Sequence, residues 1–124
     1  MSGPSAPPPL VLIVEDEEPI AQALAYIVED RGYVALVAAH GQQALELLGE
    51  HHPSLIVTDL MMPHMNGREL IAALRDTGDP LPPIVIMSAA GKRNIDDAGA
   101  DAVLPKPFEV AEVEALLSRF LEDV

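Results

Sequence analysis

The chain has 124 residues, of which 49% are hydrophobic, so it can form one domain with a single modest core. Acidic residues outnumber basic residues by 20 to 7, and the formal net charge of −13 argues against direct binding to nucleic acid or to an anionic membrane. The absence of cysteine excludes disulfides and cysteine-based zinc sites, and the absence of a long apolar run or signal sequence predicts a cytoplasmic domain without a membrane span.

The chain begins with a proline-rich stretch. Residues 1–9 have the sequence MSGPSAPPP, and such small residues and prolines bury little surface and favour an extended polyproline conformation. We therefore expect a disordered tail over residues 1–9, followed by a folded domain over residues 10–124.

Short apolar runs predict the β-strands of this domain. Three of the runs are continuously apolar, which is typical of strands that are covered by helices on both faces of a parallel sheet. Two weaker runs lie between and after them. In chain order the candidates are Leu10–Val14, Val34–Ala38, Leu55–Val57, Ile84–Met87 and Ala102–Leu104.

Apolar residues at helical spacing follow most of these runs. They predict helices around residues 20–28, 44–48, 70–74 and 110–121. The regular alternation of strand and helix predicts an α/β fold with a doubly wound, five-stranded parallel sheet and helices on both faces. Only thirteen residues, from Ala89 to Asp101, connect the last two strands, so we expect a shortened fourth helix or an irregular loop there.

Polar residues follow four of the five strands at their carboxyl ends, where open parallel sheets bind ligands. These residues are Glu15 and Asp16, Asp59, Ser88 and Lys106. We expect the three carboxylates to repel one another and to raise one another's pKa, and a hard divalent cation such as Mg²⁺ would relieve that repulsion. The lysine and the serine can pair with phosphoryl oxygens. The pattern therefore predicts a site that accepts a phosphoryl group.

Each of these residues alone also has an ordinary structural interpretation. The pair Glu15–Asp16 could form a solvated turn or a helix cap, and Asp59 could cap the loop that follows it. Ser88 could simply end a strand, and Lys106 could begin the last helix. The placement of all five residues at the same edge of the sheet favours the functional interpretation.

Four segments together resemble the bacterial response-regulator receiver domain. The resemblance extends over residues 10–122, and the segments follow one another in the family's order and spacing. They are VLIVEDE at residues 11–17, DLMMPHMNG at 59–67, IVIMSA at 84–89, and AGAD at 98–101 followed by KPF at 106–108. The resemblance implies a CheY-like (βα)₅ fold that takes a phosphoryl group from a histidine kinase.

The resemblance also implies a role for each site residue. Asp59 matches the phosphoryl acceptor, Ser88 the switch hydroxyl, and Lys106 the lysine that pairs with the phosphoryl group. The implied Mg²⁺ ligands are Glu15, Asp16, Asp59 and the backbone carbonyl of Met61. The implied partners are a sensor histidine kinase or phosphotransfer protein and a downstream output domain or protein that the sequence does not identify. No enzymatic activity is expected beyond self-phosphorylation and autodephosphorylation.

Two features depart from the family pattern. Val103 stands three residues before Lys106, where receivers usually have a tyrosine or phenylalanine, and the crossover over residues 89–101 is short. These departures keep open a second hypothesis, a pseudo-receiver that binds proteins without being phosphorylated. A Mg²⁺-dependent phosphatase on a similar sheet would need further acid–base residues and a substrate cap, and the sequence offers neither.

Overall fold

The computed structural model describes residues 7–61, 65–78, 80–89 and 99–122. Its centre is a five-stranded parallel sheet with the strand order β2-β1-β3-β4-β5. The strands are β1 (Leu10–Val14), β2 (Val34–Ala38), β3 (Leu55–Asp59), β4 (Ile84–Ser88) and β5 (Ala102–Pro105). All five predicted strands are present, so the prediction of a doubly wound parallel sheet is confirmed.

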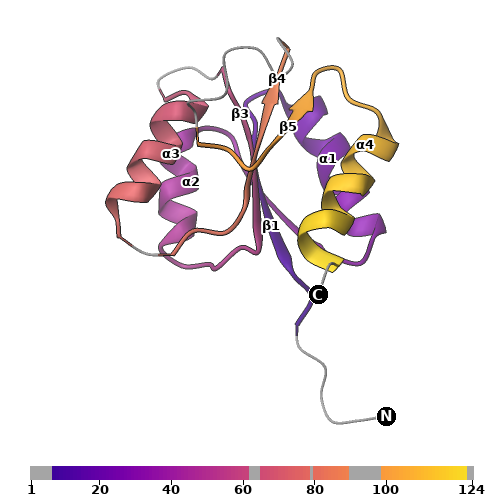
Figure 1. Cartoon of the computed structure of the whole chain (residues 1–124), viewed down its shortest axis with the longest axis horizontal. Coiled ribbons are helices and arrows are strands. Elements are labelled where there is room, and N and C mark those ends of the chain that lie inside the picture. The colour runs from indigo at the N-terminus through magenta and orange to yellow at the C-terminus, as the bar shows by residue number, and fades with distance from the viewer. Residues whose placement is uncertain (1–6, 62–64, 79, 90–98, 123–124) are drawn as a thin grey trace.

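Helices cover both faces of the sheet. α2 and α3 lie together on one face, and α1 and α4 lie together on the other (Figure 1). Their bounds are Glu18–Asp30 for α1, Gly41–Leu48 for α2, Gly67–Asp76 for α3 and Val110–Leu117 for α4, which continues as the π-helical segment η1 (Ser118–Glu122). In the part of the chain that the structure describes, no helix has the length and apolar character needed to cross a membrane.

The continuous apolar strands divide their side chains between two cores. Because successive side chains of a strand point to opposite faces, Ile56 packs on the side of α2 and α3 whereas Leu55 and Val57 pack on the side of α1 and α4. Every residue of β3 and of β4 is buried, as is expected for strands between two helical layers. The edge strand β2 differs, because Val34 and Val37 are exposed.

Two of the helices begin with side-chain caps next to the carboxyl ends of the strands. Asn66 Oδ1 accepts a hydrogen bond from Glu69 N at 2.9 Å, and Glu69 Oε1 accepts one from Asn66 N at 2.9 Å, which together form a capping box at α3. At α2, His40 Nδ1 accepts from Gln43 N at 3.1 Å. These caps satisfy amide groups that the first helical turn leaves without partners.

Two sequence predictions fall wholly or partly outside the described residues. The shortened fourth helix was expected between Ala89 and Asp101, and residues 90–98 are not described. Of the predicted tail, only residues 7–9 are described, and they belong to no helix or strand. Pro9 is nevertheless half-buried, and its carbonyl accepts a hydrogen bond from Val34 N at 2.9 Å.

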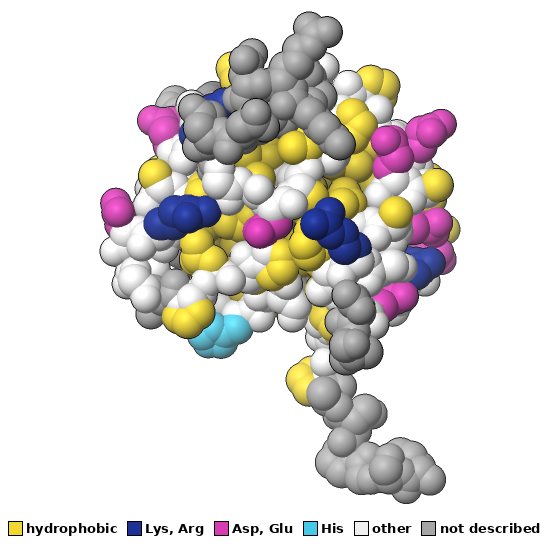
Figure 2. All heavy atoms as spheres, in the orientation of Figure 1, with side chains coloured by type: hydrophobic (Ala, Val, Ile, Leu, Met, Phe, Trp, Pro, Cys, Tyr) yellow, Lys and Arg dark blue, Asp and Glu magenta, His cyan; other side chains and the backbone are white. Residues whose placement is uncertain are grey.

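The acidic composition is visible on the surface. Figure 2 shows several acidic side chains on the side of the molecule where α4 lies, with a basic side chain among them. One exposed acidic residue beyond α4, Glu122, pairs with Arg31 at 3.0 Å.

Candidate functional site

The candidate site lies at the carboxyl ends of β1, β3, β4 and β5, and the sheet's hydrogen bonds continue into it. Glu15 N donates to Ala38 O at 3.0 Å, Leu60 N to Met87 O at 3.0 Å, and Lys106 N to Ser88 O at 3.0 Å. These bonds fix the backbone just beyond each strand. The point between β1 and β3, where the strand order reverses, is also where doubly wound sheets bind their ligands.

Three carboxylates meet at this point, as the sequence predicts. One oxygen each of Glu15, Asp16 and Asp59 lies within 4.8 Å of the others. Their surroundings differ, because Glu15 and Asp59 are buried whereas Asp16 is exposed. The structure therefore combines two shielded anions with one that faces solvent.

Lys106 neutralises part of this negative charge. Its Nζ lies 3.0 Å from Glu15 Oε1 and 3.1 Å from Asp59 Oδ2, where it also donates a hydrogen bond. Burial by itself lowers the pKa of Lys106, but its contacts with Glu15 and Asp59 outweigh that effect and leave the pKa above its ordinary value. The lysine is therefore held in its charged form between the two buried carboxylates.

Glu15 is the most shielded carboxylate of the cluster, with none of its side chain exposed. Burial raises the pKa of the Glu15 carboxyl, while a hydrogen bond from Glu17 N at 3.0 Å and the contact with Lys106 lower it. The charge of Asp59 raises the pKa as well, but by less than burial does. The pKa of Glu15 is thus raised, as the sequence analysis expects, but the main cause is the loss of hydration on burial and not repulsion by the other carboxylates.

The acceptor candidate Asp59 is positioned by the start of α3. Gly67 N donates to Leu60 O at 2.9 Å, which draws the first turn of α3 against the end of β3. A Cβ atom at residue 67 would lie 2.8 Å from Asp59 O, so this approach requires glycine. Met61 N donates a long hydrogen bond to Asp59 Oδ1 at 3.4 Å, and Met61 is 74% exposed.

Ser88 lies at the same edge of the sheet. It is the last residue of β4, is buried, and follows Met87, which pairs with Asp59 in the register of β3 and β4. Its carbonyl is the acceptor for Lys106 N, so the backbones of these two residues are joined directly. The Lys106–Pro107 peptide bond is cis.

One residue near the site was not assigned a role by the sequence analysis. Glu17 Oε2 lies 3.9 Å from Lys106 Nζ, and the Glu17 side chain is 63% exposed. A third acidic residue immediately after Glu15–Asp16 is the signal that could have drawn attention to it. Because Glu17 is so exposed, its pairing with Lys106 is weaker than the two buried contacts.

The donor set fits a hard divalent cation. Oxygens around an octahedral Mg²⁺ lie within roughly 4 Å of one another, so the three carboxylates need only a small movement to share one ion. Glu15 Oε1 is buried and accepts no hydrogen bond from any of the described residues, although Lys106 Nζ lies nearby. An oxygen in that state retains lone pairs for a metal ion.

The sequence matches the family of response regulator receiver domains over residues 11–118. The chain belongs to this family, and it is a receiver domain of the kind used in two-component signalling.

Named relatives agree with this assignment. The chain is 36% identical over 117 residues to the response regulator MprA of Mycolicibacterium vanbaalenii, covering 92% of this chain and 51% of that protein. It is 35% identical over 114 residues to MprA of Mycobacterium bovis, covering 90% of this chain and 50% of that protein. The chain therefore spans about half the length of the curated relatives it matches.

Solved structures show the same fold. The chemotaxis protein CheY4 of Vibrio cholerae superposes with a TM-score of 0.85 at 28% identity, covering 92% of this chain and 99% of that one. The receiver domain of the Francisella response regulator 1452 superposes with a TM-score of 0.78 at 33% identity, covering 90% and 98% of the two chains.

Proposed function

We propose that this receiver domain accepts a phosphoryl group on Asp59, with Mg²⁺ bound at the acidic cluster. The donor would be a histidine kinase or a phosphotransfer protein. The observation that carries the proposal is the position of Lys106 Nζ, which contacts both Asp59 and Glu15 at the carboxyl edge of the sheet. This arrangement places a positive charge beside the proposed carboxylate nucleophile, where phosphoryl oxygens would lie.

In the proposed step, an oxygen of Asp59 forms a bond to phosphorus while the bond from phosphorus to the donor's histidine nitrogen breaks. The departing imidazole keeps the electron pair of that bond, and an acyl phosphate remains on the domain. Lys106 would pair with the phosphoryl oxygens and stabilise their charge. Hydrolysis on the same residues would return Asp59 to its free form, and we propose no turnover of a separate substrate.

The cation would be held by the carboxylates of Glu15, Asp16 and Asp59, and by the Met61 carbonyl that the family resemblance implies. When bound, Mg²⁺ supplies neutralisation of the charge that accumulates on the transferring phosphoryl group. Ser88 would donate its hydroxyl to a phosphoryl oxygen from the neighbouring strand. That new contact would shift the loops at the strand ends and so report the modification to an output domain or protein.

Intact-mass measurement after incubation with Mg²⁺ and acetyl phosphate tests the proposal. The wild-type chain should gain one phosphoryl group, and Asp59→Asn should gain none because the amide is not a nucleophile. Asp30→Asn, an exposed position at the end of α1, is the matched control and should label like the wild type. A wild-type chain that gains no mass would support the pseudo-receiver, and labelling of Asp59→Asn would contradict the assignment of the acceptor.

The metal assignment has its own test. Asp16 is an exposed member of the cluster, so Asp16→Asn should weaken Mg²⁺ binding in a calorimetric titration without disturbing the core. The loss of one anion near Glu15 and Asp59 should also raise the melting temperature slightly when no Mg²⁺ is present. Asp30→Asn again serves as the control, and an unchanged Mg²⁺ affinity of Asp16→Asn would count against this ligand.

A further inference from the structure

A pocket lies away from the carboxylates, between α2 and α3 and near the amino end of β3. It has a volume of about 740 Å³, is open to solvent on one side, and is lined by the end of α2, the loop before β3, the end of α3 and the loop before β4. Cavities that hold small organic ligands in proteins measure roughly 300 to 1,000 Å³. The pocket is therefore large enough for a ligand of that kind.

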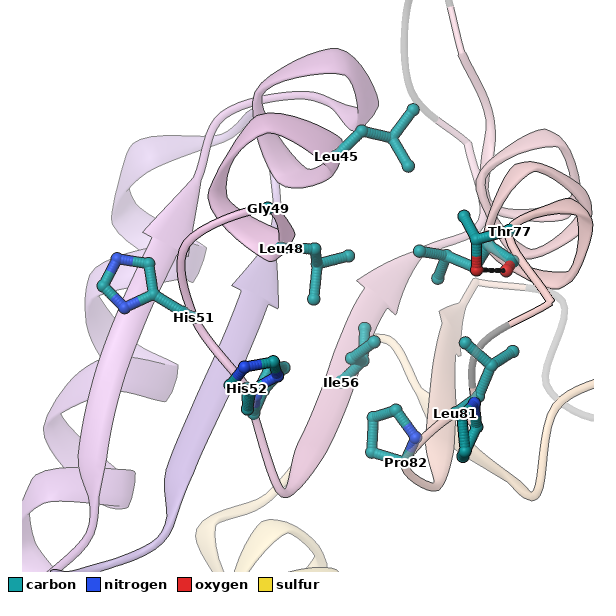
Figure 3. A pocket seen from close by; sticks show the side chains of 12 residues that line it. Leu45, Leu48, Gly49, His51, His52, Ile56, Thr77, Leu81 and Pro82 are labelled. Atoms are coloured by element: carbon teal, nitrogen blue, oxygen red, sulfur yellow. Dashed lines mark hydrogen bonds between the residues drawn. The ribbon is translucent and has the colours of Figure 1, made fainter.

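The lining of this pocket is mainly aliphatic. Figure 3 shows Leu48, Ile56, Leu81 and Pro82 directed toward a common space between the strands and the two helices. Ile56 is buried in the core, whereas Leu48 and Leu81 are only partly buried. The half-buried leucines thus present apolar surface that no described side chain covers completely, and an apolar ligand would remove that surface from water.

Polar groups in the lining are few. Thr77 Oγ1 donates its proton to Leu74 O at 2.7 Å (Figure 3), so that hydrogen is already used within the helix end. The exposed His52 lies at the side of the space near Ile56, and its imidazole can donate or accept a hydrogen bond. The pocket therefore offers the imidazoles of His51 and His52 as adaptable polar groups beside an aliphatic wall.

The negative charge around the pocket disfavours anionic ligands. The chain carries a net charge of −13, and the exposed Glu46, Glu50 and Asp76 adjoin lining residues in the sequence. An ionised group of either sign would lose hydration on entering this mainly aliphatic pocket, and a carboxylate or phosphate would in addition meet the negative field. We propose that the pocket binds an uncharged, largely apolar small molecule that carries one hydroxyl or similar hydrogen-bonding group.

Methyl NMR on the full chain tests this proposal with two probes of similar shape. 4-Phenylphenol, which is uncharged at neutral pH, should shift the methyl signals of Leu45, Leu48, Ile56 and Leu81 in a saturable way. The methyl signals of Leu24 and Val113, which lie in the core on the other face of the sheet, should not move. Biphenyl-4-carboxylate, the charged counterpart, should bind at least about tenfold more weakly.

A pair of neighbouring leucines supplies the matched variants. Leu48→Gln should raise the Kd for 4-phenylphenol about tenfold, because a lining methyl surface becomes polar. Leu47→Gln alters the same helix outside the lining and should leave the Kd within about twofold of the wild-type value. Should Leu48→Gln fail to fold, His52→Ala, at an exposed position, should weaken 4-phenylphenol binding while the methyl shifts persist.

Three results would overturn the proposal. The first is an absence of saturable shifts at the lining methyls, and the second is equal binding of the phenol and the carboxylate. The third is movement of the same methyl signals on deletion of residues 1–9 without any probe, which would identify the chain's own tail as the occupant. None of these readouts depends on phosphorylation, so the proposed function and this inference can fail separately.

Discussion

Lys106 Nζ lies 3.1 Å from Asp59 Oδ2, and this contact joins the residue after β5 to the last residue of β3. The same ammonium group also contacts Glu15, which is completely buried. Lys106 is therefore a structural counter-ion in the unmodified domain, in addition to its proposed pairing with the phosphoryl group. Both roles can be separated by experiment.

Replacement of Lys106 by methionine should destabilise the domain when no Mg²⁺ is present. The variant leaves Glu15 buried without its cation, and the loss of such a partner costs about 1 to 3 kcal/mol. Urea unfolding should show this decrease in the free energy of unfolding, and Mg²⁺ should restore part of it. The double variant Lys106→Met/Glu15→Gln should lose less stability than the single variant, because only Asp59, and no longer Glu15, is then left buried without the ammonium group. Equal losses in the two variants would contradict the proposed pairing.

Gly67→Ala should also destabilise the domain and disturb the surroundings of Asp59. The new Cβ would lie 2.8 Å from Asp59 O and 3.1 Å from Leu60 Cα, and these backbone atoms can move only if α3 shifts away from β3. A loss of about 1 to 3 kcal/mol is expected in urea unfolding, together with slower labelling by acetyl phosphate.

The control for that substitution is Gly49→Ala. Gly49 has φ −69° at the end of α2, and the nearest described atom that a Cβ there would meet is Glu46 O of the preceding turn, at 3.3 Å. The free energy of unfolding of Gly49→Ala should stay close to the wild-type value or increase by up to about 1 kcal/mol. If Gly67→Ala behaves like Gly49→Ala, the close approach of α3 to Asp59 does not constrain the residue type.

The stability of the domain should fall in alkaline solution, partly because of Tyr33. Burial raises the pKa of Tyr33 from 10.0 to about 12, and the hydrogen bond to Glu122 and the negative charge of Glu122 contribute to the increase. The folded state then retains a proton that the unfolded chain releases, so this stabilisation is present below pH 10 and is lost as the pH rises toward about 12. The raised pKa of Lys106 acts in the same direction.

Urea unfolding at a series of alkaline pH values measures this effect. Tyr33→Phe should reduce the slope of stability against pH without abolishing it, because Lys106 still contributes. Tyr26→Phe removes the exposed tyrosine of α1, keeps the contact between Tyr33 and Glu122, and is the matched control. An identical slope in the wild type and in Tyr33→Phe would refute the assignment.

Activation should not lead to strong dimerisation through β5. Val103 pairs with Ile86, is half-buried, and supplies no aromatic ring at the position where receivers usually have one. With beryllofluoride as a phosphoryl mimic, the NMR signals of residues near Ser88 and Lys106 should shift. Light scattering under the same conditions should show a largely monomeric protein. A strong dimer through the β5 face that forms only with the mimic would show that the missing ring is unimportant.

Strand positions and site residues were accessible from the sequence for a simple physical reason. A parallel sheet between two helical layers requires continuous apolar strands, so such runs predict the strand positions. The carboxyl ends of parallel strands share one edge of the sheet, so the sequence alone predicts that Asp59 and Lys106 lie close together. These features depend on local patterns and on topology.

Burial and pairing depend on three-dimensional detail and were less accessible. Glu15 and Asp16 are adjacent and chemically alike, yet Glu15 is buried and Asp16 is exposed. The contact between Glu17 and Lys106 and the hydrogen bonds from Arg31 and Tyr33 to Glu122 join residues far apart in the chain. No periodicity in the sequence encodes such contacts.

The edge strand β2 has a consequence for how the protein behaves at high concentration. Its five residues, Val34–Ala38, include no charged residue and no proline, and Val34 and Val37 are 45% and 38% exposed. β2 is the outermost strand on its side of the described sheet, so its outer edge is a template for a strand of another copy. Electrostatic repulsion between molecules of charge −13 opposes that encounter, and it vanishes near the isoelectric point of about 4.4. Colloidal stability should therefore decline in mildly acidic buffer before the fold itself is lost.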